Sequence, residues 1–187
     1  MKPWRDDPFS PEERAEPVVV VPYDPTWPAT FDLLRARLAP ALGELAAGIE
    51  HVGSTAVPGL AAKPIVDVDV VLRRTRDLPA AVERLEALGY QHLGDLGIAE
   101  RTAFRAPPGW PRHHLYVCPA GAPVLRAHLR LRDELRADPA LVQAYAELKC
   151  ALAERYRDDR DAYAEGKTPF IAGVFGRKSG QRRARRK

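Results

Sequence analysis

The chain has 187 residues, 45% of them hydrophobic, which suits a single domain with a core of its own. No apolar run approaches the ~20 residues of a membrane span, and residues 1–16 lack the apolar stretch of a secretory signal, so we expect a cytoplasmic protein that does not enter the membrane. Residues 177–187 hold seven basic side chains and no acidic ones; without them 22 basic side chains stand against 25 acidic ones, so the formal net charge of +4 belongs to this tail.

Sequence patterns predict a small sheet. The strongest strand signal is residues 65–72, in which β-branched residues alternate with aspartates. Weaker strand signals occur, in chain order, at residues 49–52, 90–93, 101–105 and 112–118, and residues 18–21 are expected to be a short strand or an extended edge. Residues 107–111 contain three prolines and one glycine and are expected to connect the last two strands as a hairpin.

Helical patterns flank the sheet and then follow it. Two helices are expected within the sheet region, and the chain after residue 118 is expected to be helical. The predicted helices begin at residue 28, with Phe31, Leu34, Leu38 and Leu42 on one face, and then cover 77–88, 124–135, a longer segment with Leu141, Tyr145, Leu148 and Leu152 on one face, and 168–175. This order indicates an α/β (α+β) fold: a small mixed sheet with flanking helices and a C-terminal helical layer.

The domain organisation follows from these signals. Residues 1–16 are expected to be a flexible arm, residues 17–176 a single domain, and residues 177–187 a disordered basic tail. Such a tail can bind RNA or DNA weakly and without sequence preference, because its charges neutralise phosphates. A disordered end that only aids solubility is the favoured alternative.

The candidate site is a spacing of two short motifs. Gly53 and Ser54 lie at a turn after a predicted strand, and twelve residues later Asp67 and Asp69 share one face of the strongest strand. Backbone N–H groups and a hydroxyl at such a turn suit a phosphate, especially at a helix start. Two neighbouring carboxylates suit Mg²⁺ together with nucleotide phosphates, although a solvated face of an edge strand is the alternative.

The longer stretch around these motifs resembles the GrpB family. Residues 51–69 read HVGSTAVPGLAAKPIVDVD, and further matching segments are VPYDPTWP at 21–28, HHLYV at 113–117 and GKTPFI at 166–171. The resemblance covers about residues 19–175. It implies the nucleotidyltransferase fold, and it implies little about substrate. Similar domains are fused to dephospho-coenzyme-A kinase in some proteins, which suggests a supporting role.

One departure from the nucleotidyltransferase superfamily concerns its third carboxylate. The superfamily usually takes this group from a neighbouring strand, and the candidate strand at 112–118 has none. We expect His114 to stand in its place, as a ligand or general base, with His113 in a structural role. The predicted catalytic and metal-binding residues are therefore Asp67, Asp69 and His114. Imidazole is a poor ligand for Mg²⁺, so Mn²⁺ and Zn²⁺ are alternatives to it.

Further basic residues are candidates for phosphate contact. Besides Gly53 and Ser54, these are Lys63, Arg101, Arg105 and Lys167. Arg101 and Arg105 fall on one face of a predicted strand and could clamp a polyanion together, with surface ion pairing as the equal alternative. Lys149 and Lys167 recur in the GrpB resemblance, and lysine is scarce here, with 6 Lys against 23 Arg, which favours a specific role for them; Lys167, just before a predicted helix, is the candidate for phosphate contact.

Three functions compete at this point. The first is metal-dependent transfer of a nucleotidyl group from an NTP to a small acceptor, with Asp67, Asp69 and His114 as the reacting centre. The second is a module that binds a nucleotide, coenzyme or other phosphorylated small molecule without chemistry. The third is an RNA-associated protein that uses the tail. The sequence does not set the oligomeric state.

Overall fold

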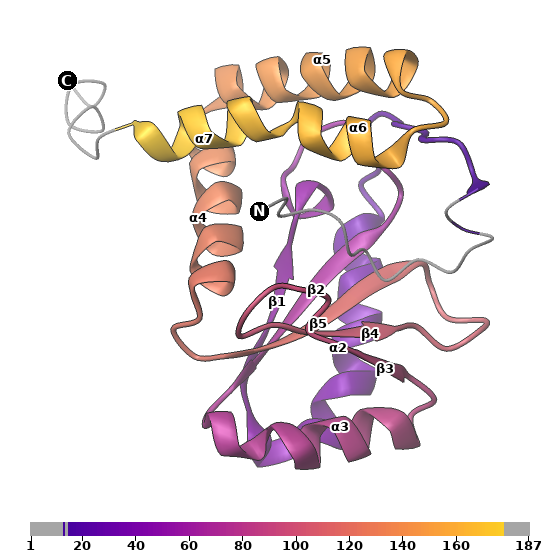
Figure 1. The fold of residues 1–187 in the computed structure, drawn as a ribbon, viewed down its shortest axis with the longest axis vertical. Coiled ribbons are helices and arrows are strands. Elements are labelled where there is room, and N and C mark those ends of the chain that lie inside the picture. Colours follow the sequence, from indigo (N-terminus) through magenta and orange to yellow (C-terminus); the bar gives the residue numbers. More distant parts are fainter. Residues whose placement is uncertain (1–12, 14, 178–187) are drawn as a thin grey trace.

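A five-stranded mixed sheet forms the centre of the structure, which is a computed structural model that describes residues 13 and 15–177 (Figure 1). The strands follow the order β1-β2-β5-β4-β3 across the sheet. Their bounds are Ala46–Val52 for β1, Val66–Leu72 for β2, Gln91–Gly94 for β3, Thr102–Arg105 for β4 and His113–Pro119 for β5. The two strands that carry the predicted catalytic residues, β2 and β5, are parallel neighbours inside this sheet.

The other strand pairs are antiparallel. β1 pairs with β2, β4 with β5, and β3 with β4, so β2 and β5 are both paired on each side. Within β2, the alternation of valine and aspartate separates the two faces of the sheet. Val66, Val68 and Val70 are buried in the main hydrophobic core, and the aspartates point to the opposite face. The sequence pattern of this strand therefore places the acidic side chains on the face away from that core.

Helices α2 (Trp27–Leu42) and α3 (Leu78–Ala87) pack against the core face of the sheet (Figure 1). The apolar stripe expected on the first helix is confirmed, because Phe31, Leu34, Leu38 and Leu42 all belong to the main core. Burial of one such leucine contributes about 1.5–3 kcal/mol, so this stripe is enough to fix the helix on the sheet.

The C-terminal helices form a separate layer, whose members are α4 (Pro123–Ala137), α5 (Pro139–Arg155), α6 (Arg160–Gly166) and α7 (Thr168–Gly176). Helices α5, α6 and α7 lie across one end of the sheet, at the top of Figure 1, and α4 runs along the sheet at the left. A second hydrophobic cluster joins this layer to the loop before β2, where Val57 and Leu60 contact Leu141, Tyr145 and Val174 among others. The helical layer is thus held against the loop that carries the Gly-Ser turn. The predicted α+β fold with a C-terminal helical layer is confirmed.

Several local predictions differ from the structure. Residues 18–21 do not form a strand and make only one bridge, between Val21 and Ala62. Helix α6 is not among the predicted helices; it is seven residues long and is capped by Asp159, whose side chain accepts a hydrogen bond from the Ala162 N–H at 2.9 Å. The segment is too short for an apolar stripe to mark it. The helix predicted over 77–88 has Asp77 at its N-cap position, but the Asp77 carboxylate makes no capping hydrogen bond and pairs with Arg74 at 2.9 Å.

The predicted termini lie largely beyond the described residues. Positions 1–12 and 14 of the arm and 178–187 of the basic tail are outside them, so the tail's binding to nucleic acid remains a prediction. Within them, Glu16 accepts a hydrogen bond from Arg112 at 2.7 Å, and Arg177 donates one to Asp138 at 3.3 Å. No helix in the described part of the chain has both the length and the apolar character needed to cross a membrane.

Candidate functional site

Asp67 and His114 lie side by side on the paired strands β2 and β5. They are register partners in the parallel ladder, and His114 Nδ1 donates a hydrogen bond to Asp67 Oδ1 at 2.8 Å. Burial opposes the charge of Asp67, but this hydrogen bond and the nearby imidazole hold the pKa of its carboxyl below the usual value. Asp67 is therefore a carboxylate at neutral pH, oriented by His114.

Gly53 lies directly against Asp67. Its φ of +70° is in the left-handed region, and a Cβ built on it would come within 2.0 Å of Asp67 Oδ2. Both the backbone conformation and the space therefore require glycine. Ser54 then begins a 3₁₀ turn of three residues, Ser54–Ala56, and not an α-helix. A phosphate here would gain backbone N–H groups and a hydroxyl, but no helix dipole.

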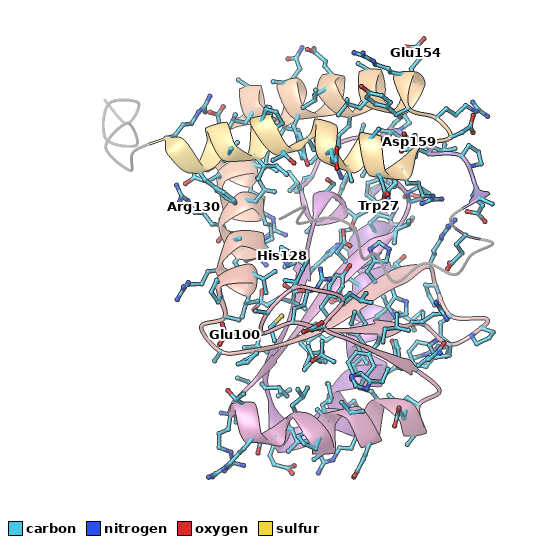
Figure 2. The ribbon with its side chains drawn as sticks, viewed as in Figure 1. Trp27, Glu100, His128, Arg130, Glu154 and Asp159 are labelled. Carbon is cyan, nitrogen blue, oxygen red and sulfur yellow. The ribbon has the colours of Figure 1, made fainter. Side chains whose placement is uncertain are left out.

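Asp69 does not share the environment of Asp67. Its side chain is completely buried, and His128 Nδ1, from helix α4, donates a hydrogen bond to Asp69 Oδ2 at 2.8 Å. Figure 2 shows His128 on the side of α4 that faces the sheet. Burial disfavours the imidazolium, but the bond to Asp69 and the charges of both aspartates raise the pKa of His128 above its usual value. His128 thus forms a buried ion pair that the sequence pattern did not reveal, because 59 residues separate the partners.

The predicted metal ligands do not fit a divalent cation in this arrangement. Such a cation between Asp67 and Asp69 would need an oxygen from each in one open space. Asp69 is completely buried and does not share an open space with Asp67. Its Oδ2 atom accepts the hydrogen bond from His128, and its Oδ1 atom has no hydrogen-bond partner among the described residues. In residues 13 and 15–177, no three His, Cys, Asp or Glu side chains are grouped so that they could hold a metal ion.

A cavity of about 230 Å³ lies between the sheet and the C-terminal helices. Asp67 and His114 line it together with Gly53 and Ser54, and Asp69 does not. Most of the charged side chains around it are basic. The basic residues are Lys63, Arg101, His114, His128, Arg132, Lys149, Arg160 and Lys167, whereas the carboxylates are Asp67 and Asp161. The cavity therefore favours an anionic ligand.

All three lysines of the described chain converge on this cavity. They come from the loop before β2, from α5 and from the start of α7, and are Lys63, Lys149 and Lys167. Lys149 is 2% exposed, and its ammonium donates to the carbonyl of Ala61. It was not among the candidate residues, although a sequence signal exists. Lys149 falls four residues after Tyr145, on the buried stripe of α5. A lysine on the apolar face of a helix is unusual, and this position is therefore the signal.

The structure separates the two predicted arginines. Arg101 precedes β4, is buried, and stacks its guanidinium 4.5 Å from the ring centroid of Tyr116 beside the cavity. Arg105 ends β4, donates a hydrogen bond to Gln91 at 2.7 Å, and lines a different hollow near Trp110. The two do not face the same cavity, so they do not form the expected clamp around one polyanion.

Two further histidines, His113 and His51, have structural contacts. His113 Nδ1 donates to the carbonyl of Pro111 at 2.6 Å, and its Nε2 contacts the Tyr90 hydroxyl at 2.7 Å, as expected for a packing role. His51 stacks on Phe31 and contacts Thr55 at 3.0 Å, and burial lowers its pKa to about 4. His51 is therefore neutral at physiological pH and supports the turn beneath the cavity.

Comparison with known proteins places the chain in a family. The family model described as "GrpB protein" matches residues 17–177, which is most of the chain. The chain belongs to the GrpB family. A UPF0157 protein of Pseudomonas aeruginosa (PA4798) is 42% identical over 164 residues, covering 86% of this chain and 67% of that protein. A dephospho-CoA kinase of Mycolicibacterium paratuberculosis is 31% identical, and the GrpB-like match spans 46% of its length.

Solved structures show the same fold in other proteins. GrpB from Enterococcus faecalis superposes with a TM-score of 0.76 at 32% identity, covering 83% of this chain and 94% of that one. A Cid1 poly(U) polymerase with MgGTP bound gives a TM-score of 0.52 at 18% identity, covering 73% of this chain and 45% of the other. The GrpB chain described here therefore has a nucleotidyltransferase-like fold.

Proposed function

We propose that the cavity of this GrpB protein binds the phosphate groups of a nucleotide or a similar phosphorylated small molecule. The observation that carries the proposal is the convergence of Lys63, Lys149 and Lys167 on the same cavity as the Gly53-Ser54 turn. Ammonium groups and backbone N–H groups are common ligands of phosphate oxygens. The nucleotidyltransferase-like fold and the dephospho-CoA kinase relative support a nucleotide or coenzyme as the ligand class.

Ion pairing distinguishes the lysines from the cavity's arginines. Arg132 pairs with the carboxylates of Glu50 and Asp133, both at 2.9 Å, and Arg160 lies 4.0 Å from the carboxylate of Glu16. Within the described residues, neither Lys149 nor Lys167 forms an ion pair with a carboxylate. The carboxylate of Asp67 is the acidic group that favours the charged form of both lysines. A phosphate group would supply the missing counter-charge.

The size of the cavity sets which part of the ligand is enclosed. Pockets for drug-sized ligands usually measure about 300–1,000 Å³, and this one measures about 230 Å³. A phosphate chain with part of a sugar fits that space, whereas a whole nucleotide would extend beyond it. We therefore expect the phosphates inside, near the lysines, and the base at the mouth.

Replacement of Lys167 by methionine tests the binding proposal. We expect nucleoside triphosphate affinity to fall about tenfold to a hundredfold, because a hydrogen bond to a charged group contributes about 1.5–3 kcal/mol. Isothermal titration calorimetry measures the change. Arg76→Met is the matched control, because Arg76 is exposed and does not line the cavity. Equal affinities of the wild type and the Lys167 variant would contradict the proposal.

The Asp67–His114 pair supports nucleotidyl transfer as a second candidate function. With Nδ1 bonded to a carboxylate, an imidazole can take a proton at Nε2, as a general base. An acceptor hydroxyl would lose its proton to His114 and attack the α-phosphate, and pyrophosphate would leave beside the lysines. Incubation of the protein with each NTP and hydroxyl-bearing acceptors, followed by a pyrophosphate assay, tests this. Pyrophosphate release that His114→Gln does not lower would exclude the role of His114.

A further inference from the structure

The three lysines rest on the rings of two buried tyrosines. The ammonium of Lys149 lies 4.7 Å from the ring centroid of Tyr145, and that of Lys167 lies 4.7 Å from the centroid of Tyr163. The ammonium of Lys63 lies 5.8 Å from the same Tyr163 ring. Burial raises the pKa values of both phenols, so the rings are neutral. The two tyrosines thus gather the three lysine side chains at one end of the cavity, where the neutral rings offer weak cation–π attraction.

Burial and mutual repulsion favour the neutral form of these lysines when no anion is bound. Burial, together with the charge of Lys167, lowers the pKa of Lys149 to about 7. Lys167 is partly exposed as a residue, but burial of its ammonium group and the positive charge of Lys63 lower its pKa to about 8. The groups that face these two ammonium ions are Asp67 from β2, Lys63 from the loop before it, Cys150 and Tyr145 from α5, and Arg160, Asp161 and Tyr163 from α6.

A bound phosphate group would reverse this balance. An anion beside an ammonium ion favours its charged form, and the effect is large where water is excluded. A terminal phosphate carries close to two negative charges above its second pKa of about 6, whereas a phosphodiester carries one. A terminal phosphate with two negative charges therefore compensates the positive charges of these lysines better than a diester with one.

We propose that the lysine end of the cavity selects a terminal dianionic phosphate, and that binding of this group places a proton on Lys149. The inference rests on the proposed binding of a phosphorylated ligand and specifies its class: a phosphomonoester or polyphosphate, and not a diester such as a nucleic-acid backbone. Binding is thereby linked to proton uptake. In neutral solution without ligand, the Lys149 side chain is only partly protonated, so it can take up a proton when the ligand binds.

Calorimetry in two buffers measures the proton uptake directly. The full-length protein is titrated with ATP at pH 8 in Tris and in HEPES, whose ionisation enthalpies differ. ATP is fully ionised at this pH, so any protons taken up go to the protein. At pH 8 a lysine with a pKa near 7 is about 90% neutral and one with a pKa near 8 is about half neutral, so we expect Lys149 to take up about 0.9 proton and Lys167 to add up to about 0.5. At pH 6 the uptake attributable to the lysines is expected to fall close to zero.

Two variants and a second ligand sharpen the test. Lys149→Arg keeps the positive charge without a titration near pH 8, so we expect binding with uptake reduced by about 0.9 proton; Arg76→Met should leave the uptake unchanged. A 3′,5′-cyclic nucleotide, a monoanionic diester, should bind at least tenfold more weakly than the corresponding 5′-monophosphate. The wild-type titrations decide the matter even if Lys149→Arg does not fold.

The outcomes separate this inference from the proposed function. ATP binding with the same heat in both buffers at pH 8 would overturn proton uptake but leave nucleotide binding intact. Equal affinity for the 3′,5′-cyclic nucleotide and the 5′-monophosphate would overturn the selection of a dianion and would also leave nucleotide binding intact. Failure of all the nucleotides to bind would overturn the proposed function, and this inference with it.

Discussion

Replacement of Gly53 by alanine is expected to lower the free energy of unfolding by about 3 kcal/mol. The φ of +70° strains any residue with a Cβ, and the new methyl group would lie 2.0 Å from Asp67 Oδ2 and 2.9 Å from Asp67 Cβ. Positive-φ strain costs about 1–3 kcal/mol, and overpacking costs a similar amount. Because Asp67 must move, the cavity changes shape, and ATP affinity should fall as well. Urea denaturation and calorimetry measure the two effects.

Gly59→Ala is the matched control for this variant. Gly59 has a similar φ of +80°, but a Cβ there would meet no atom within 4 Å. Its replacement should cost only about 1 kcal/mol, from the backbone conformation alone, and should leave ATP affinity unchanged. The difference between the two variants isolates the close approach to Asp67. Equal losses of stability would show that this approach has no energetic consequence.

Removal of the Asp69 carboxylate is expected to have a comparable effect on stability. Asp69→Ala removes the group that raises the pKa of His128 and leaves this part-buried imidazole without its partner, and loss of a hydrogen bond to a charged group costs about 1.5–3 kcal/mol. The variant Asp69→Asn, which keeps the shape, should lose less than Asp69→Ala. The free energy of unfolding from urea titrations at pH 6 measures both. A loss below 1 kcal/mol for Asp69→Ala would argue against a charged His128.

The pH dependence of stability gives an independent measure of the same pair. The pKa of His128 is raised in the folded protein above its unfolded value near 6.5. The pair therefore contributes its full stability below about pH 6.5 and loses it as the pH rises through the folded-state pKa. We expect the difference in unfolding free energy between the wild type and His128→Gln to be larger at pH 6 than at pH 9. A difference that is constant over this range would contradict the assignment.

The sequence predicts the sheet well where a local pattern decides the structure. The alternation in β2 determines which face holds the aspartates, and strand adjacency then brings His114 to Asp67. The GrpB resemblance gives the fold and part of the cavity, including the Gly53-Ser54 turn and Lys63. These features depend on neighbours in the chain or on a continuous motif, which is why they can be read before the structure is seen.

Other features depend on contacts that no local pattern encodes. His128 meets Asp69 only because α4 returns along the sheet, and this pairing means that the two aspartates of the Asp-x-Asp motif have different roles: Asp67 lines the cavity, and Asp69 is buried and bonded to His128. Arg101 and Arg105 share a strand-like spacing, but the strand begins after Arg101, so the two diverge. Lys149 lies among apolar residues of α5, and only packing against the loop before β2 places it at the cavity.

Because the cavity lies between the sheet and the C-terminal helices, a bound ligand would contact both and hold them together. Ser54 and Asp67 belong to the sheet side, whereas Lys149 and Lys167 belong to the C-terminal helices. A molecule held by both sides must be released before the helices can separate from the sheet. At a concentration 100 times its dissociation constant, such a ligand would stabilise the fold by about 2.7 kcal/mol. Thermal melting in the presence of a library of phosphorylated metabolites is thus a direct route to the natural ligand.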